Sequence, residues 1–300
     1  MTEIKNENID GWKQALRSAL ILGMTGKTSE KIKAIIDVGR YYTCYAPTSL
    51  YKYYSDDSRY LEAVKNNQMW YSAPCNFNDV FDCTITIEEK DIFDCALRMA
   101  SEKMEIRVGS QMWKKVKEVT NQQIRKFLSD FEDLRTRMGI ACLSEIDDSL
   151  LMWAHYANNH SGICVEYELL EFNSQLHFSP VPIVYTDERV CIHTLETLAM
   201  DIQGLFIESL TSKSPEWSYE REWRIIRDDG ACGDKWDNVK RGALLEATRP
   251  KSITLGCMAK PEYEKDVRKY CEENRVNLYK MEKSRVNYRL EKTTVLQFEE

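Results

Sequence analysis

Two glutamates and an arginine lie at alternate positions in the stretch Trp-Ser-Tyr-Glu-Arg-Glu-Trp-Arg-Ile-Ile, residues 217–226. Read as a β-strand, this stretch points Glu220, Glu222 and Arg224 to one face of a sheet. Carboxylates on alternate residues of a strand lie about 7 Å apart. A carboxylate beside a reacting sugar carbon stabilises developing positive charge. The stretch therefore predicts either a catalytic carboxylate pair or a half-exposed sheet face with a Glu–Arg ion pair.

His155 is the second residue that could do chemistry, and it is one of four histidines in the chain. The sequence Met-Trp-Ala-His-Tyr at residues 152–156 predicts a short helix that begins after the capping residues 147–149. A histidine there can act as a general base or serve as a hydrogen-bonded structural residue. His160 lies five positions further on, a poor spacing for two metal ligands on one helical face, so we expect no metal site.

Side-chain amides and carboxylates gather at residues 75–82, which we expect to form a loop. Asn78 and Asp79, together with Asn76 and Asp82, can coordinate a cation or hydrogen-bond a ribose or an amide. The alternative is that these side chains bond to the backbone of their own loop and stabilise its turns.

Composition and charge limit the classes of function. Of the 300 residues, 43% are hydrophobic, and no apolar run approaches the roughly 20 residues that span a bilayer. The net charge is −7 with acidic and basic residues interspersed, so we expect no general binding to duplex nucleic acid and no membrane association. The N-terminus lacks the basic and apolar regions of a signal peptide, which predicts a cytoplasmic protein.

The cysteines and the missing motifs limit the chemistry further. Ten cysteines include no Cys-x-x-Cys pair, so we expect reduced, mostly buried thiols rather than zinc ligands or disulfides. The sequence also lacks the glycine-rich nucleotide-binding motifs, the His-Glu-x-x-His of zinc proteases and the Gly-x-Ser-x-Gly of α/β-hydrolases. These absences argue against those enzyme classes.

Apolar periodicity and turn residues predict a mixed succession of helices and strands. The expected helices cover residues 11–24, 28–39, 59–67, 93–136 with a break near Gly109, 150–157, 194–211 and 261–273. The expected strands cover residues 50–54, 69–73, 140–143, 163–167, 183–185, 217–226, 252–255 and 277–281. Because strands and helices do not alternate strictly, the order predicts an α+β fold with a compact mixed strand core.

We expect two parts along the chain. Residues 1–48 form an N-terminal helical hairpin that supports the core or contacts a partner. Residues 49–300 form a single α+β domain with a helical insertion at about residues 93–136.

Five short motifs resemble a known family. They are Leu-Tyr-Lys-Tyr at 50–53, Met-Trp-Tyr-Ser-Ala-Pro at 69–74, Phe-Asn-Asp-Val-Phe-Asp at 77–82, Leu-Met-Trp-Ala-His-Tyr-Ala at 151–157 and Tyr-Glu-Arg-Glu-Trp-Arg at 219–224. In combination they are similar to a widespread bacterial domain-of-unknown-function family, number 2971, over about residues 49–260. The family pattern has Pro where this chain has Val80.

A looser resemblance is to the ADP-ribosyltransferases. They share the layout of an aromatic and basic first strand, a helix, a second strand with an aromatic residue and Ser, and a late strand carrying Glu. The resemblance implies split sheets and an NAD site with contacts at Tyr51 or Lys52, at Trp70, Tyr71 or Ser72, and at Glu220 or Glu222. It also implies aromatic stacking on nicotinamide and, for Arg224, either pyrophosphate binding or neutralisation of the glutamates.

The resemblance favours an NAD-consuming enzyme, either an ADP-ribosyltransferase or an NAD glycohydrolase, acting as a toxin or an anti-phage effector. Its acceptor would be a protein or a nucleic acid. Two alternatives stay open: a non-enzymatic module that binds a ligand or partner, and a metal-dependent nuclease that uses Asp79, Asp82 and the two glutamates.

Overall fold

A computed structural model describes residues 11–101, 106–176, 180–193 and 202–298 of the chain. Residue contacts group the chain into two compact units, each assembled from three segments. Unit 1 contains residues 1–45, 74–137 and 184–215, and unit 2 contains residues 46–73, 138–183 and 216–300. The sequence-based division at residue 48 stays a prediction.

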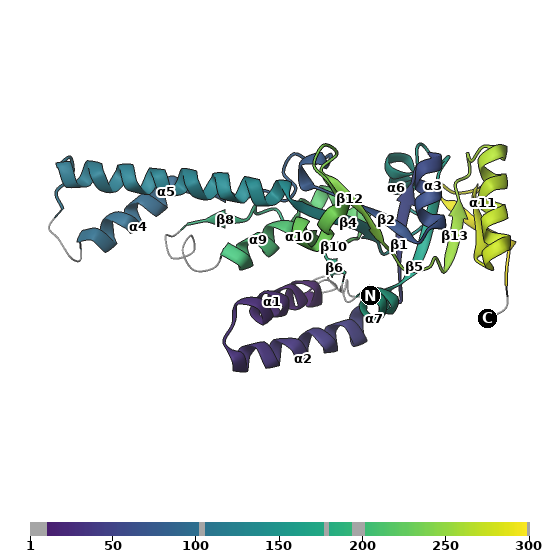
Figure 1. Cartoon of the computed structure of the whole chain (residues 1–300), viewed down its shortest axis with the longest axis horizontal. Helices are drawn as coiled ribbons and strands as arrows, with labels where there is room; N and C mark the ends of the chain where they lie inside the picture. The colour runs from purple at the N-terminus through teal and green to yellow at the C-terminus, as the bar shows by residue number, and fades with distance from the viewer. Residues whose placement is uncertain (1–10, 102–105, 177–179, 194–201, 299–300) are drawn as a thin grey trace, which may run out of the picture. The chain divides into compact units, whose positions relative to one another are not determined.

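Unit 1 includes the helical hairpin that the sequence predicts (Figure 1). Its helices are α1, Gly11–Thr25, and α2, Thr28–Tyr45. Leu16 of α1 is fully buried, and Ala34 of α2 is buried where a side chain at Gly23 of α1 would touch it. The two helices therefore meet along a face of small and aliphatic side chains, and α2 buries little else.

The helix α9, Ile202–Leu210, packs on α1 within unit 1. Arg17 of α1 strengthens this contact, because its Nη1 donates to Ser212 Oγ at 2.7 Å just beyond the end of α9. The sequence predicts a helix over residues 194–211. Its second half is confirmed, and residues 194–201 lie outside the described residues.

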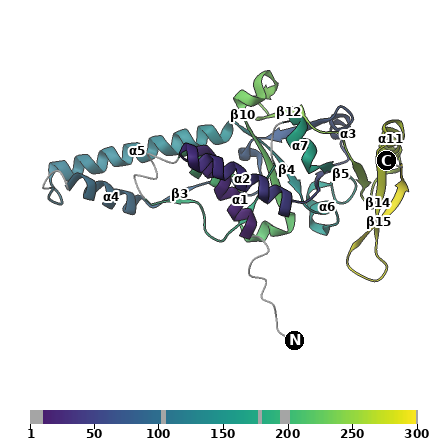
Figure 2. The same ribbon diagram turned by 90° about the horizontal axis from the view of Figure 1, so that it is seen from below.

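The predicted helical insertion consists of two helices that lie side by side in both views (Figures 1 and 2). α4 is Glu89–Ser101 and α5 is Gln111–Thr136. The predicted break is confirmed near Gly109, whose φ of 83° suits glycine, and Ser110 then caps α5 by accepting a hydrogen bond from Trp113 N at 3.1 Å. The shared core of this part of unit 1 is formed by Ile92, Ile124, Phe127, Phe131, Ile192 and Leu205.

Short parallel strand pairs complete unit 1. They are β3, Thr86–Ile87, with β8, Cys191–Ile192, and β7, Val184–Tyr185, with β9, Ser212–Lys213. One 3₁₀ turn, η1, covers Pro74–Asn76. Strands this short carry too little sequence pattern to be predicted individually.

Unit 2 is built on an 11-stranded mixed sheet (Figure 1). The order is β11-β12-β2-β4-β1-β5-β13-β14-β15, with β10 paired to β4 and to β6. The bounds are β1 Ser49–Tyr54, β2 Gln68–Ser72, β4 Met138–Ser144, β5 Ile163–Glu168, β6 Val181–Pro182, β10 Glu222–Asp228, β11 Trp236–Asp237, β12 Gly242–Glu246, β13 Ser252–Leu255, β14 Asn277–Lys283 and β15 Leu290–Leu296. Only β13 and β14 pair in parallel within this sheet.

Helices cover the connections of this sheet. They are α3 Ser58–Lys65, α6 Leu150–Tyr156, α7 Leu169–Leu176, α10 Asp229–Cys232 and α11 Pro261–Asn274, with 3₁₀ turns η2 Pro215–Glu220 and η3 Gly233–Lys235. The predicted helices at 59–67, 150–157 and 261–273 are confirmed. The sequence prediction missed α7 and the strands β12 and β15, which are short or dominated by polar residues.

The sheet divides where β4 meets its neighbours. Glu145 N, just after β4, donates to Arg221 O at 3.1 Å. In the antiparallel register, the backbone groups of the odd-numbered residues of β4 therefore face β10, and those of the even-numbered residues face the other edge. The other edge of β4 pairs with β2 only at Ile140 and with β1 only at Ser144. These two positions lie four residues, or about 13 Å, apart along the strand. The strands β1 and β2 therefore separate beside β4, and the residue between them is Cys142.

The mixed helical and stranded architecture, with its N-terminal hairpin, confirms the predicted α+β class. None of the helices in the described residues has the length and apolar character needed to cross a membrane.

Gly162, just before β5, allows the backbone to approach closely at Tyr54. A Cβ at residue 162 would overlap the carbonyl oxygen of Tyr54 and contact the backbone of Ser55. We expect Gly162→Ala to lower the free energy of unfolding by more than about 2 kcal/mol. The matched control is Gly39→Ala in α2, where a Cβ meets nothing within 4 Å and should stabilise the helix by up to about 1 kcal/mol. Thermal denaturation followed by circular dichroism measures both, and equal melting temperatures for Gly162→Ala and wild type would contradict the packing described.

Candidate functional site

The two glutamates of the predicted carboxylate pair lie on different elements. The 3₁₀ turn η2 ends at Glu220, Arg221 has a positive φ of 43°, and β10 begins at Glu222. The predicted strand at 217–226 is therefore wrong for residues 217–221 and confirmed from Glu222 onward. Positive φ is uncommon for a residue with a β-carbon, so the turn at Arg221 has no clear signal in the sequence.

Within β10 the alternation is the predicted one, but both faces are buried. Trp223 and Ile225 are fully buried on one face. On the other, Glu222 is 3% exposed and Arg224 is 0% exposed. The expected half-exposed sheet face is therefore replaced by a fully buried ion pair.

Arg224 binds the Glu222 carboxylate through two hydrogen bonds. Its Nε donates to Oε1 at 2.7 Å, and its Nη2 donates to Oε2 at 3.0 Å. This fork geometry gives the strongest type of arginine–carboxylate contact. Removing two charges from water is costly, and the pair persists only because each charge compensates the other.

Neighbouring strands place polar groups next to this pair. Ser144 of β4 is opposite Glu222 of β10 and also opposite Tyr51 of β1, and Cys142 is opposite Arg224. The pairs Ser144–Glu222 and Cys142–Arg224 are of the non-hydrogen-bonded type, in which opposite side chains approach each other most closely. The strand register therefore aligns a tyrosine, a serine and a glutamate in one row across the sheet.

The Lys52 side chain bonds to β4 at the point where β1 and β2 separate. Its Nζ donates to the carbonyl oxygen of Cys142 at 2.9 Å, at the β4 position that neither β1 nor β2 pairs with. Burial lowers the pKa of the Lys52 ammonium, and electrostatic attraction from the neighbouring Cys142 and Glu222 side chains partly opposes this shift. Lys52 is therefore a buried amino group beside the ion pair, rather than an exposed group for a cofactor phosphate.

Glu220 is held separately by α6. The Tyr156 hydroxyl donates to Glu220 Oε1 at 2.5 Å, and Ser144 Oγ donates to the Glu220 carbonyl oxygen at 2.6 Å. Glu220 itself is 3% exposed. Ser149 caps α6 as predicted, accepting from Met152 N, and so helps to fix the position of Tyr156.

Aromatic side chains continue from Tyr156 toward the surface. The His155 ring centroid lies 6.3 Å from those of both Tyr156 and Tyr219, and the Tyr219 centroid lies 6.1 Å from that of Trp217. His155 is exposed, whereas Tyr156, Tyr219 and Trp217 are half-buried. We call these four residues the aromatic row. It is a surface that can stack on a planar ring, directly beside a buried carboxylate.

Tyr51 packs against the same hydrophobic cluster as Tyr156 and Tyr219. Burial and the nearby carboxylates of Glu166 and Asp147 raise the pKa of the Tyr51 hydroxyl above its usual value. The structure therefore brings Tyr51, His155 and Glu220 of the predicted site into one region of unit 2.

The NAD contacts predicted on the second strand, at Trp70, Tyr71 or Ser72, lie elsewhere in the sheet. Trp70, Tyr71 and Ser72 are on β2, which joins β4 about 13 Å from the position that β1 joins. Tyr71 is fully buried, and burial raises the pKa of its hydroxyl to about 12. Its hydroxyl has no hydrogen-bond partner among the described residues. These residues belong to the sheet interior on the far side of the division from Tyr51.

The predicted polar loop belongs to unit 1. Asp79 Oδ1 accepts from Phe81 N at 2.9 Å, which is the local turn-stabilising role weighed for Asn78 and Asp79. Asp82 is 2% exposed and lies 3.6 Å from Nζ of the buried Lys213. The described residues hold no group of three or more His, Cys, Asp or Glu side chains able to bind a metal.

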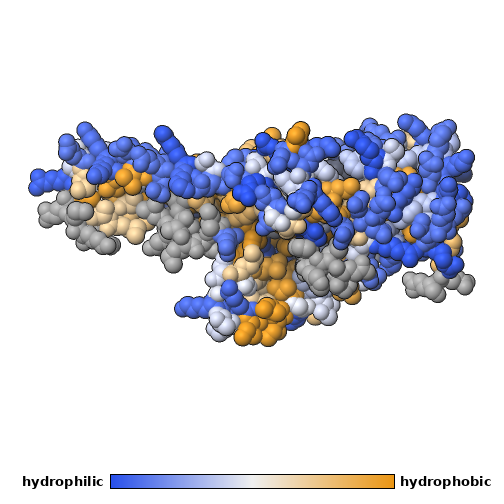
Figure 3. Space-filling model, viewed as in Figure 1, coloured by the Kyte–Doolittle hydropathy of each residue, from blue (hydrophilic) through white to orange (hydrophobic). Residues whose placement is uncertain are grey.

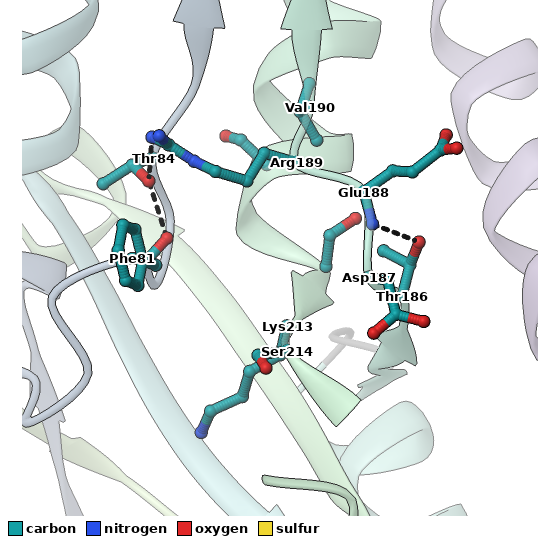
Figure 4. Close-up of a pocket in the computed structure, with 11 residues that line it drawn as sticks. Phe81, Thr84, Thr186, Asp187, Glu188, Arg189, Val190, Lys213 and Ser214 are labelled. Carbon is teal, nitrogen blue, oxygen red and sulfur yellow. Dashed lines mark hydrogen bonds between the residues drawn. The ribbon is translucent and has the colours of Figure 1, made fainter. Parts of the chain in front are cut away.

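Unit 1 also contains a pocket of about 230 Å³ that the sequence did not indicate (Figure 4). Arg189 points across it, with its Nη2 donating to Thr84 Oγ1 at 3.1 Å and its guanidinium 5.3 Å from the Phe81 ring centre. Asp187, Glu188 and Arg189 are all exposed at its mouth. Charges of both signs at a solvent-exposed mouth do not define one ligand class, so the pocket adds no chemistry to the site in unit 2.

Comparison with known proteins identifies one match. Residues 152–225 match the model of a family described as "Protein of unknown function (DUF2971)". This region is similar to that family. The matched range begins in α6 and ends in β10, so it contains the aromatic row, Glu220 and the Glu222–Arg224 pair. No curated protein and no solved structure matches the chain, and no match supports the resemblance to ADP-ribosyltransferases.

Several residues around the Glu222–Arg224 pair and Glu220 were not singled out from the sequence. Tyr156 and Ser144 hold Glu220, and Cys142 accepts from Lys52. Tyr156 is adjacent to His155 in one of the quoted motifs, which is a usable signal. The roles of Ser144 and Cys142 depend on strand register, which no local pattern encodes.

A double-mutant cycle tests whether the Glu222–Arg224 pair acts as a unit. Because Arg224→Met leaves the buried carboxylate without its arginine, we expect it to cost about 3–5 kcal/mol of unfolding free energy. Adding Glu222→Gln should restore part of that loss. The control is Lys126→Met in the exposed pair Lys126–Asp130, with an expected change below about 1 kcal/mol. Urea denaturation measures all variants, and simple additivity of the two single losses would contradict the coupling.

Alkaline stability tests the burial of Tyr71. The folded pKa of about 12 exceeds the ordinary value of 10.0, so the neutral hydroxyl contributes stability that is complete below pH 10 and lost as the pH rises toward 12. Between pH 9 and pH 12 the unfolding free energy of wild type should fall by about 2–3 kcal/mol more than that of Tyr71→Phe, which has no hydroxyl to ionise at this position. The exposed Tyr288→Phe is the matched control. Equal losses in wild type and Tyr71→Phe would contradict this assignment.

Proposed function

We propose that the protein is an NAD-consuming enzyme, either an ADP-ribosyltransferase or an NAD glycohydrolase, with its site at the aromatic row of unit 2. The observation that carries the proposal is the buried Glu220 carboxylate, held by Tyr156 directly beside the aromatic row. Stacking surfaces recognise planar rings such as nicotinamide, and a fixed carboxylate suits a reaction that develops positive charge.

The chemistry assigned to these residues is cleavage of the bond between nicotinamide N1 and ribose C1′. The bonding electron pair leaves with the nicotinamide nitrogen, which loses its positive charge. The ribose carbon becomes oxocarbenium-like, and the Glu220 carboxylate stabilises that charge. Water or an acceptor group then bonds to C1′ and releases a proton, and the proposal assigns His155 as the base that takes it.

Glu222 and Arg224 have a supporting role in this proposal. Arg224 is fully buried and engaged with Glu222 of the same strand, which favours compensation of the buried carboxylate over pyrophosphate binding. The proposal therefore concentrates the carboxylate chemistry on Glu220. A role as a toxin or anti-phage effector would follow from depletion of NAD in the cell.

A second candidate is a ligand-binding module without chemistry. The observation that favours it is that both carboxylates are buried and already hydrogen-bonded, Glu220 to Tyr156 and Glu222 to Arg224. In this case the aromatic row recognises the ligand, and the glutamates only stabilise the protein.

Release of nicotinamide from NAD tests the proposal and separates the two candidates. The purified chain is incubated with NAD, with and without cell lysate as a source of acceptors, and nicotinamide is quantified by chromatography. We expect Glu220→Gln to reduce the release by about 10²–10³-fold, because a fixed electrostatic partner of the transition state is removed. Glu216→Gln, an exposed glutamate on the same 3₁₀ turn, should leave the rate unchanged.

Calorimetric titration with NAD completes the test. Binding that Glu220→Gln retains, together with its loss of turnover, supports the enzymatic proposal. Binding to wild type without any nicotinamide release favours the second candidate. The absence of both binding and release would contradict the proposal.

A further inference from the structure

The outer face of α2 in unit 1 is apolar and exposed. Ile32, Ile35 and Ile36 are 58%, 68% and 66% exposed, and they lie on one face because they are three and four residues apart. Hydrophobic atoms gather over α2 at the bottom of Figure 3. Contiguous exposed apolar side chains of this size mark interaction sites in soluble proteins.

Gly39 and Thr43 continue this face toward the end of α2. We call Ile32, Ile35, Ile36, Gly39 and Thr43 the α2 stripe; it spans 12 residues, or about 16 Å of helix. It contains no charged residue. The opposite face, with Ala34, is the one that packs on α1, so the stripe is not needed to hold the hairpin together.

Gly39 forms a notch in the middle of a helix. Glycine is disfavoured in helix interiors relative to alanine, and a Cβ at Gly39 would meet nothing within 4 Å. No packing within the described chain therefore accounts for a glycine there. A glycine on an exposed apolar stripe allows the backbone of another helix to approach closely. A lipid surface would gain nothing from such a notch.

Both borders of the α2 stripe are basic. Lys33 and Arg40, seven residues apart, follow one border, and Lys31 lies on the other. The hairpin at residues 11–45 has six basic and two acidic residues, a net charge of +4, whereas the whole chain carries −7. Two copies of α2 paired through their stripes would bring basic borders together in either orientation, so a second copy of this chain is a poor fit.

We infer that the α2 stripe is a docking site for an amphipathic helix of another protein whose apolar face is bordered by acidic residues. The isoleucines supply the apolar contact, Gly39 admits a partner side chain, and Lys31, Lys33 and Arg40 pair with partner carboxylates. This interaction is independent of the function proposed for unit 2, because every residue in it belongs to unit 1.

Two synthetic helical peptides of 18 residues test the inference. Both carry the same leucine face, one bordered by glutamates and the other by lysines, and binding to the full chain is measured by fluorescence anisotropy. We expect the glutamate peptide to bind at least tenfold more tightly, with an affinity that falls as salt rises. Ile36→Gln and Gly39→Gln should each weaken that binding at least tenfold. Met99→Gln, which changes an exposed methionine on α4 of the same unit, is the control.

A charge-swap variant sharpens the result. Lys33→Glu combined with Arg40→Glu should reverse the preference, so that the lysine peptide binds more tightly. Failure of the glutamate peptide to bind, or equal binding of both peptides, would overturn the inference. It would also be overturned if sedimentation showed α2-dependent self-association, or if vesicles containing phosphatidylserine bound the chain while the peptides did not.

Discussion

The buried ion pair between Glu222 and Arg224 is the interaction on which the arrangement of unit 2 depends. Both residues belong to β10, and each buried charge compensates the other, so β10 can lie inside unit 2 only while the pair is formed. The pairing of β10 with β4 sets Ser144 opposite Glu222, and Ser144 in turn donates to the backbone of Glu220. The position of Glu220, two residues before Glu222, and with it the contact to Tyr156, therefore depends on the pairing of β10 with β4.

The division of the sheet beside β4 accounts for the burial of the Lys52 side chain. Because β1 and β2 join β4 at separate points, the Cys142 carbonyl has no strand partner on that edge, and Lys52 supplies the missing donor. The interior of unit 2 therefore contains Lys52, Arg224 and the carboxylates of Glu220 and Glu222 close to the point where β1, β4 and β10 meet. The aromatic row is at the margin of this charged interior, which makes it the part of unit 2 best suited to bind a polar planar ligand.

The sequence predicted those parts of the fold that local pattern determines. The alternation of Trp223 and Ile225 with Glu222 and Arg224 was sufficient for β10, and Gly109 was sufficient for the break between α4 and α5. The turn at Arg221 was missed because a non-glycine residue with positive φ leaves no local signal. The expected grouping of Trp70, Tyr71 and Ser72 with Tyr51 in one site stays a prediction. The structure joins β1 and β2 to β4 at positions about 13 Å apart, and adjacent strand motifs do not encode such a separation.

The central claim is that the aromatic row and Glu220 form one binding site for the nicotinamide ribose of NAD. A crystal structure of the chain with a non-cleavable carbocyclic NAD analogue tests it most directly. We expect the nicotinamide ring to stack on Tyr219 or His155, with the ribose hydroxyls within hydrogen-bond distance of Glu220. An analogue bound away from these residues, or crystals in which Glu220 remains paired with Tyr156 and no analogue is bound, would contradict it.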